Sequence, residues 1–285
     1  MKWLTQITAI AAIYCLAAVL GMKLSVASGN ISPVWPATGF AIAAVYLGGY
    51  HLALGVGLGG LVFELCTEAP WIVCVGGPIA NMLEPIIAVY LIRRFTRGGA
   101  PFSSAVNVIE YFVFAGVVAT AASATIGVAS MCAGNVGPWS QYGFLWSTWW
   151  LGNIMGAVVV APAILVWTEP LRGWRQRRRI VEGLALVGLL LATCFFIFVT
   201  GMQLIGWSGN APVAIFCMPF VIWAALRFER HGSVLATIII CTIAICATVG
   251  GLGPFVLSAS VVRSLLLLQA FMGVVAMTGL ALALL

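Results

Sequence analysis

The sequence contains no aspartate, and charged residues make up only 7% of its 285 positions. Soluble domains carry roughly a quarter charged residues, so this shortage excludes an ordinary soluble domain. Glutamate supplies all seven acidic residues. Without aspartate the chain has little with which to hold Mg²⁺ for phosphoryl transfer. Because hydrophobic residues make up 63% of the chain, its composition indicates an integral membrane protein.

The local motifs of common enzymes are missing as well. The sequence has no phosphate-binding GxxxxGK[ST] loop, no HExxH zinc motif and no GxSxG nucleophile motif. Its eight cysteines form no CxxC pair and no Cys/His cluster, and nearly all lie in apolar runs. We therefore predict that this chain is not an enzyme, and we expect no catalytic residue, no metal and no cofactor in it.

Long apolar runs dominate the chain. A helix needs about 20 apolar residues to cross a bilayer, and seven runs reach or approach that length. Three more runs, 36–48, 52–67 and 211–227, are shorter or rich in glycine. The sequence predicts an all-α, polytopic transmembrane bundle of about ten helices, forming a single domain over 1–285 with no soluble domain. Eight crossings with a re-entrant hairpin at 36–48 and 52–67 are the alternative. The seven longer runs are 3–26, 71–94, 105–131, 143–167, 180–202, 232–250 and 264–285.

The basic residues predict the orientation. Positive charge gathers on the cytoplasmic side of membrane proteins. Ten crossings with both termini cytoplasmic place eleven of the thirteen Lys and Arg residues on that side, in the loops at 93–97, 172–179 and 227–230 and at Lys2. Glutamates beside these loops are expected to form local ion pairs. No basic face carries interleaved aromatics, which argues against nucleic acid. We expect a multi-pass protein of the bacterial inner (plasma) membrane, with the lipid bilayer as its partner.

Some polar residues are predicted to lie at membrane depth, where each is a candidate functional group. Glu84 falls in the middle of the run 71–94, and Asn81, three residues earlier, shares its helix face. Glu64 lies near the outer end of the run 52–67, where it could line an outward-facing pocket. The alternative is that Glu84 is protonated and only holds helices together.

Aromatic residues gather in one part of the run 143–167. Trp146, Trp149, Trp150 and Asn153 recur at spacings of three and four, which predicts that they share one side of a helix. An aromatic wall with an amide one turn deeper suits a flat or cationic ligand. An interfacial tryptophan belt would explain Trp146 equally well, but it does not explain Asn153.

The segment 31–39, ISPVWPATG, resembles the opening signature of the first class of MASE domains, which are bacterial membrane-associated sensors. Later stretches follow in the same order: Asn81–Pro85 before Arg93–Arg94, Trp150–Pro162, Pro219–Arg227, Gly253–Phe255 and Leu268–Gln269. The resemblance covers essentially the whole chain. It implies an N-terminal input module that precedes a cytoplasmic diguanylate cyclase (GGDEF), phosphodiesterase, PAS or histidine-kinase output. The chain would then be a stand-alone sensor or the membrane part of a longer protein.

The position of Asn153 is often acidic in that family, so asparagine argues against a role there that requires a charge.

We expect a sensor that binds an unknown small ligand, ion or membrane protein partner and signals through helix 264–285; a homodimer is compatible with this. The rival is a small-molecule transporter or its substrate-binding membrane subunit, and the third alternative is a scaffold. The predicted ligand-binding residues are Trp35, Glu64, Asn81, Glu84, Trp149, Trp150 and Asn153.

Overall fold

The computed structural model describes residues 2–25, 31–96, 100–170, 177–200, 213–257 and 260–285. Over these residues the chain is helical and contains no β-sheet, which confirms the predicted all-α class. It divides into two compact units, residues 1–162 and residues 163–285.

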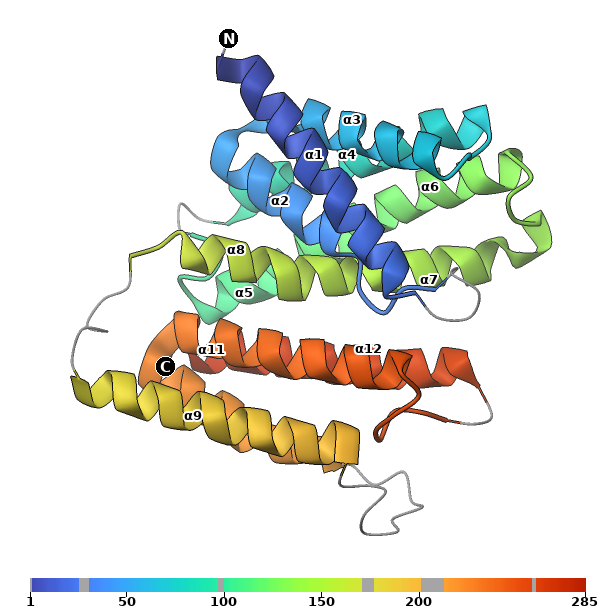
Figure 1. Ribbon diagram of the computed structural model, residues 1–285. Coiled ribbons are helices and arrows are strands. Elements are labelled where there is room, and N and C mark those ends of the chain that lie inside the picture. The colour runs from blue at the N-terminus through green and yellow to red at the C-terminus, as the bar shows by residue number, and fades with distance from the viewer. Residues whose placement is uncertain (1, 26–30, 97–99, 171–176, 201–212, 258–259) are drawn as a thin grey trace. The chain divides into compact units, whose positions relative to one another are not determined.

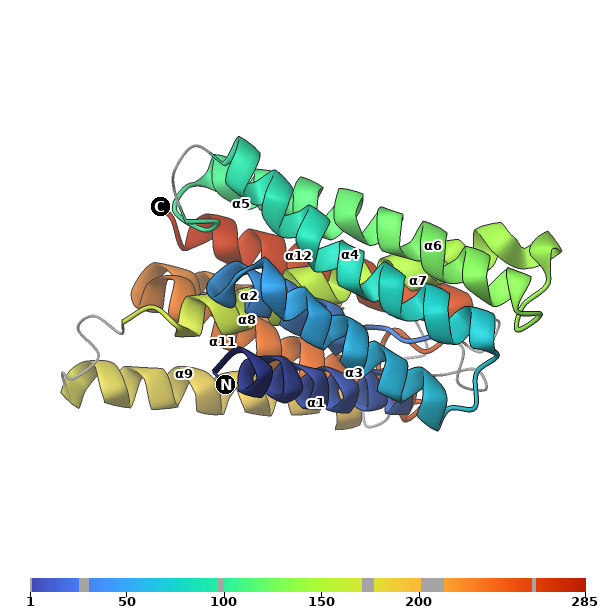
Figure 2. The ribbon, with the colours of Figure 1, turned by 90° about the horizontal axis from the view of Figure 1, so that it is seen from above.

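The first unit is built from eight helices, the last of which continues into the second unit. α1 packs along α3, and α4 packs along α6 (Figures 1 and 2). Wide π-helical turns join α5 to α6 and α7 to α8, at Phe112–Ala119 and Gly156–Val160. The bounds are α1 (Lys2–Lys23), α2 (Pro36–Gly48), α3 (Ala53–Cys66), α4 (Trp71–Phe95), α5 (Ala105–Tyr111), α6 (Thr120–Ala133), α7 (Tyr142–Met155) and α8 (Ala161–Trp167).

α2 is short because its sequence defines both of its ends. Pro36 occupies the first helical turn, where its missing N–H loses no bond. Gly49 ends the helix at φ 102°, a conformation that favours glycine. Between these points Ala37, Ile42 and Val45 are fully buried. α2 therefore lies in the interior of the first unit, against α4 and the π-helical turn 156–160.

Glycines allow two close helix crossings in the first unit. A Cβ on Gly59 would collide with the backbone oxygen of Ala11 in α1, and one on Gly39 would collide with the backbone oxygen of Gly156. Small residues at such crossings let helix backbones approach closely, which drives helix association in lipid. The crossing of Gly39 and Gly156 fixes the start of α2 against the end of α7.

The second unit contains α9 (Arg177–Phe195) with a π-helical turn at Phe196–Thr200, a 3₁₀ turn at Val213–Cys217, α11 (Met218–Val249) and α12 (Val261–Leu282). α11 packs against both α9 and α12. The backbone of α11 leaves the helical conformation at Glu229, where φ is 54° and ψ is −146°. Glu229 thus separates two helices, at the arginine-containing loop that the sequence predicts between 227 and 232.

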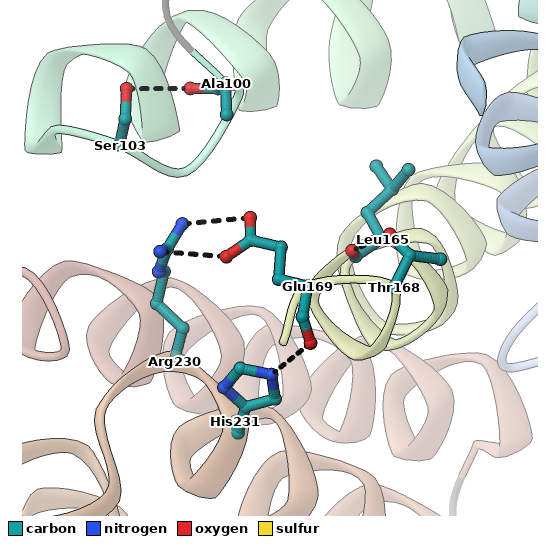
Figure 3. Close-up of polar contacts among 7 residues, drawn as sticks. All are labelled: Ala100, Ser103, Leu165, Thr168, Glu169, Arg230 and His231. Carbon is teal, nitrogen blue, oxygen red and sulfur yellow. Dashed lines mark hydrogen bonds and ion pairs between the residues drawn. The ribbon is translucent and has the colours of Figure 1, made fainter. Parts of the chain in front are cut away.

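Two ion pairs flank this break. Arg227 Nε donates to both carboxylate oxygens of Glu182, each at 2.8 Å. Arg230 forms a bidentate pair with Glu169 at 3.1 and 2.9 Å, and the His231 ring lies 3.3 Å from the Glu169 carbonyl oxygen (Figure 3). Both glutamates are therefore ion-paired as predicted, but their partners lie 45 and 61 positions away and not in the adjacent arginine loop.

The helices have the length and surface of a multi-pass membrane protein. Seven helical stretches in the described residues are long and apolar enough to span a bilayer. Large apolar side chains such as Leu4 and Leu16 on α1 and Leu184 on α9 are exposed, as expected of lipid-facing positions. Each of the ten predicted runs coincides with helix in its described part, but the number that cross, and the side on which the termini lie, remain predictions.

Candidate functional site

A cavity of about 490 Å³ lies within the first unit. It is bounded by α1, by the segment leading into α2, by the end of α3 and the turn that follows it, and by α4, α6 and α7. This volume falls within the range of small-molecule sites in proteins, which is roughly 300–1,000 Å³. The cavity is therefore large enough for a small organic ligand.

Five of the seven predicted ligand-binding residues line this cavity: Trp35, Glu64, Asn81, Trp149 and Asn153. They come from four elements far apart in the chain, namely the start of α2, α3, α4 and α7. Asn81 and Asn153 are almost fully buried. The structure thus brings these five side chains together around one space, while binding of a ligand by them remains a prediction.

Glu84 lies behind the cavity wall. Its carboxylate Oε2 accepts a hydrogen bond of 2.7 Å from Asn153 Nδ2. The hydroxyls of Thr38 and Ser123 lie near the same carboxyl. Even so, Oε1 has no partner at normal hydrogen-bonding geometry in the described residues. Glu84 is only 1% exposed, so it reaches the cavity through Asn153 rather than directly.

Trp35 is fixed by backbone contacts. The backbone N–H of Trp35 donates to the Gly152 carbonyl at 2.9 Å, which ties the start of α2 to α7. Ser32, three residues earlier, donates to the carbonyls of Gly21 and Val34. These bonds hold the 31–35 segment against α1 and α7. The indole of Trp35 is therefore held at the cavity edge by a rigid frame.

Trp149 and Trp150 occupy different environments although they are adjacent. Trp149 packs on Gly127 of α6, where any larger residue would meet its ring, and it lines the cavity. Trp150 lies outside the cavity lining, and its Nε1 donates to the Val117 carbonyl at 3.1 Å. Trp150 therefore satisfies a carbonyl of the π-helical turn 112–119. In the other π-helical turn, the Tyr111 hydroxyl donates to the Ala157 carbonyl at 2.8 Å.

Several lining residues were not predicted from the sequence. Glu68 borders the cavity from just beyond the end of α3, four residues after Glu64. Nothing in the sequence around Tyr14 or Thr148 marks either residue as part of a site. They reach the cavity because of the way α1 and α7 each pack within the first unit. Phe63 also lines the cavity, and its position next to Glu64 did not predict this, because neighbouring helix positions point about 100° apart. The cavity is also lined by Ser32 and Thr67.

Among the described residues, the charged side chains that line the cavity are all acidic. These are Glu64 and Glu68, and no described Lys, Arg or His borders it. The described residues also contain no group of three His, Cys, Asp or Glu side chains able to hold a metal ion. The cavity therefore offers carboxyl, amide and hydroxyl groups and aromatic rings to a ligand, and no basic side chain of the described residues.

A smaller cavity, of about 310 Å³, lies within the second unit at the break of α11. Its lining combines Arg179, Arg227 and Arg230 with Glu169, Glu229 and His231. Because two of these arginines already pair with carboxylates, their charge is largely neutralised. The cavity of the first unit is therefore the stronger candidate for a ligand site.

Comparison with known families gives one clear result. The MASE1 family model matches residues 6–285 of this chain. No curated protein and no solved structure shows a significant match to the sequence.

Proposed function

Because the chain belongs to the MASE1 family of membrane-associated sensor domains, we propose that it is a sensory input domain whose ligand binds in the cavity of the first unit. The observation that carries this proposal is the bond between Asn153, which lines the cavity, and Glu84, which is buried beneath it. A ligand that contacts the Asn153 amide acts on a buried carboxyl between α4 and α7. The packing of these helices then depends on whether the cavity is occupied.

Signalling follows from this dependence. A ligand shifts a conformational equilibrium only through a difference in its affinity for the two states. The Asn153–Glu84 bond supplies such a difference, because a ligand that hydrogen-bonds the amide favours one arrangement of the pair. We propose that the change passes through the C-terminal helix α12 to a cytoplasmic output of the diguanylate cyclase or histidine kinase type.

The same proposal places the chain in the bacterial inner membrane with both termini in the cytoplasm, and assigns no catalysis to it. A fluorescent protein and a secreted phosphatase, each fused after Leu285, test the orientation. The fluorescent fusion is expected to be bright and the phosphatase fusion inactive, since folding and activity of these reporters require opposite sides of the membrane. The reverse result would place the C-terminus outside.

Two substitutions test the sensing role in cells. The chain is fused to a diguanylate cyclase output, and cyclic-di-GMP is measured across growth conditions for the parent and for Glu84→Gln and Asn153→Ala. Both variants are expected to change the response of the output without removing the protein from the membrane. Gly143→Ala is the control, because Gly143 lies on the same helix as Asn153 with nothing within 4 Å of an added Cβ. An unchanged response under every condition would contradict the proposal.

Transport is the second candidate, and one feature favours it. The cavity is bordered by the short helix α3 and by α4, which contains Pro78 and Pro85. Short helices and proline-containing helices around a central site are typical of transporters. Accumulation of a cationic compound such as 2-phenylethylamine in proteoliposomes containing this chain alone would favour transport; binding without accumulation would favour sensing.

A further inference from the structure

We propose that the cavity of the first unit binds an organic cation, that is, a protonated or quaternary amine carried on a flat or apolar body. This inference rests on the proposed function, since it names the class of ligand that the same cavity receives. It is drawn from the charge, the aromatic faces and the hydrogen-bonding oxygens of the cavity lining.

The charge of the lining selects for a cation. Glu64 and Glu68 both border the cavity, and no basic side chain of the described residues neutralises them there. The Glu64 carboxyl lies against Gly77 of α4, with Oε1 3.0 Å from the position that a Cβ would occupy. The missing side chain thus lets this half-buried carboxyl approach α4. An anionic ligand would meet uncompensated repulsion, whereas an ammonium group would supply the absent counter-charge.

Aromatic rings supply the second feature. Trp35 and Phe63 meet edge to face, with centroids 6.0 Å apart and planes at 77°. Trp149 lines the cavity as well. Aromatic faces attract cations through the ring quadrupole, and tryptophan does so most strongly. Tryptophans and a carboxylate around one space form the kind of environment in which proteins hold quaternary and protonated amines.

Hydrogen-bonding oxygens supply the third feature. Asn81 is only 8% exposed and lines the cavity. Because its side chain borders the cavity, a ligand there can hydrogen-bond the amide. Asn153 donates through Nδ2 to Glu84, which leaves its carbonyl oxygen as an acceptor at the cavity. The two amide oxygens and the Glu64 carboxyl are therefore the acceptors that these residues offer to an ammonium group.

The size of the cavity excludes a bare metal ion as the ligand that fills it. About 490 Å³ is far more than an ion requires, and the described residues offer no group of three metal-ligating side chains. An apolar or flat body attached to the ammonium would occupy the remaining space beside Trp35 and Trp149. The chemistry of the ligand is therefore that of an aryl- or alkyl-amine.

Three probes of nearly equal shape test the proposal by varying only charge: 2-phenylethylamine, 2-phenylethanol and 3-phenylpropionate. Their binding to the full chain in nanodiscs is measured by the shift of the thermal unfolding midpoint and by quenching of tryptophan fluorescence. The amine is expected to bind about tenfold more tightly than the alcohol, as one cation–π contact and one counter-charge would give. The carboxylate is expected to bind more weakly than the alcohol.

Matched variants locate the effect. Glu64→Gln keeps the shape of the side chain and removes its charge, so the preference for the amine over the alcohol is expected to fall severalfold while alcohol binding stays. Trp149→Leu is expected to weaken the amine more than the alcohol. Glu110→Gln is the control, since Glu110 is a carboxyl of the same unit that does not border the cavity. This variant is expected to keep the full preference.

The outcomes separate this inference from the proposed function. Equal binding of the three probes, a preference for the carboxylate, or no binding of any probe would overturn the cation inference. If the alcohol or the carboxylate binds and changes the output of the cyclase fusion, the sensing role stands and only the charge class is wrong. If the amine binds with the expected preference and leaves the output unchanged, the cation site stands and the sensing role fails.

Discussion

Asn153 of α7 and Glu84 of α4 are joined by a hydrogen bond of 2.7 Å across 69 positions of sequence, and both are buried. The bond connects the cavity wall to the interior of the first unit. In a membrane interior an unsatisfied carboxyl or amide has no water to bond, so each residue depends on the other. This dependence can be measured as a coupling energy.

A double-mutant cycle of Glu84→Ala and Asn153→Ala measures that coupling, because each substitution removes one partner of the bond. Each single variant is expected to lower the free energy of unfolding, and the double variant to lower it by less than their sum. Couplings measured for hydrogen bonds between transmembrane helices average about 0.6 kcal/mol and reach about 1.7 kcal/mol. Unfolding in mixed detergent micelles, followed by tryptophan fluorescence, provides the measurement. Additive single effects would show that the bond contributes nothing.

The glycine crossing of α2 and α7 gives a second prediction. Gly39→Ala would push a methyl group into the Gly156 backbone, which cannot move without displacing Trp35. Overpacking of this kind lowers the free energy of unfolding by about 1–3 kcal/mol. Gly143→Ala is the matched control, because its Cβ meets open space and alanine favours helix. The control is expected to unfold at or above the parent temperature, and a Gly39→Ala protein as stable as the control would contradict the close crossing.

Tyr111 gives a third prediction. Tyr111→Phe keeps the ring and removes the hydroxyl that bonds the Ala157 carbonyl at 2.8 Å. Leaving that buried carbonyl without its donor is expected to lower the free energy of unfolding by about 1 kcal/mol or more. Tyr90→Phe serves as the control, because Tyr90 is 57% exposed. Equal stability of the two variants would indicate that the π-helical turn does not need the bond.

The break in α11 gives a fourth prediction. Glu229 has φ 54° and ψ −146°, a conformation that side chains with a Cβ adopt only under strain. Glu229→Gly is expected to raise the free energy of unfolding by about 1 kcal/mol through relief of this strain. Glu229→Ala removes the carboxylate but keeps the Cβ, so it is expected to show no such gain. A gain in both variants would assign the effect to the charge instead.

Helix positions were predictable from the sequence because simple chemistry marks them. Pro36 and Gly49 bound α2, and the arginines at 227 and 230 mark the break that the backbone makes at Glu229. A polar or helix-breaking residue between apolar runs carries this information without any tertiary contact. The two π-helical turns of the first unit were not predicted, because the pattern of apolar residues does not distinguish a π-helical turn from an α-helical one.

The site was predictable as a set of residue types but not as a geometry. Asn153 and Glu84 stood out because polar groups are rare at membrane depth. Their hydrogen bond depends on how α4 and α7 are each rotated about the helix axis, and this rotation could not be predicted from a single sequence. Trp149 and Trp150 show the same limit. The sequence placed both on one side, but neighbouring positions on a helix differ by about 100° in direction, so only Trp149 lines the cavity.

The π-helical turn Gly156–Val160 begins three residues after Asn153 and separates α7 from α8. A π turn holds one residue more than an α turn, so its conversion to α geometry would rotate the helix beyond it by about 100° relative to the part before it. Tyr111 holds this turn open by occupying the Ala157 carbonyl. The chain thus has, directly below its cavity, a segment whose two hydrogen-bonding patterns correspond to two angular settings of the following helix.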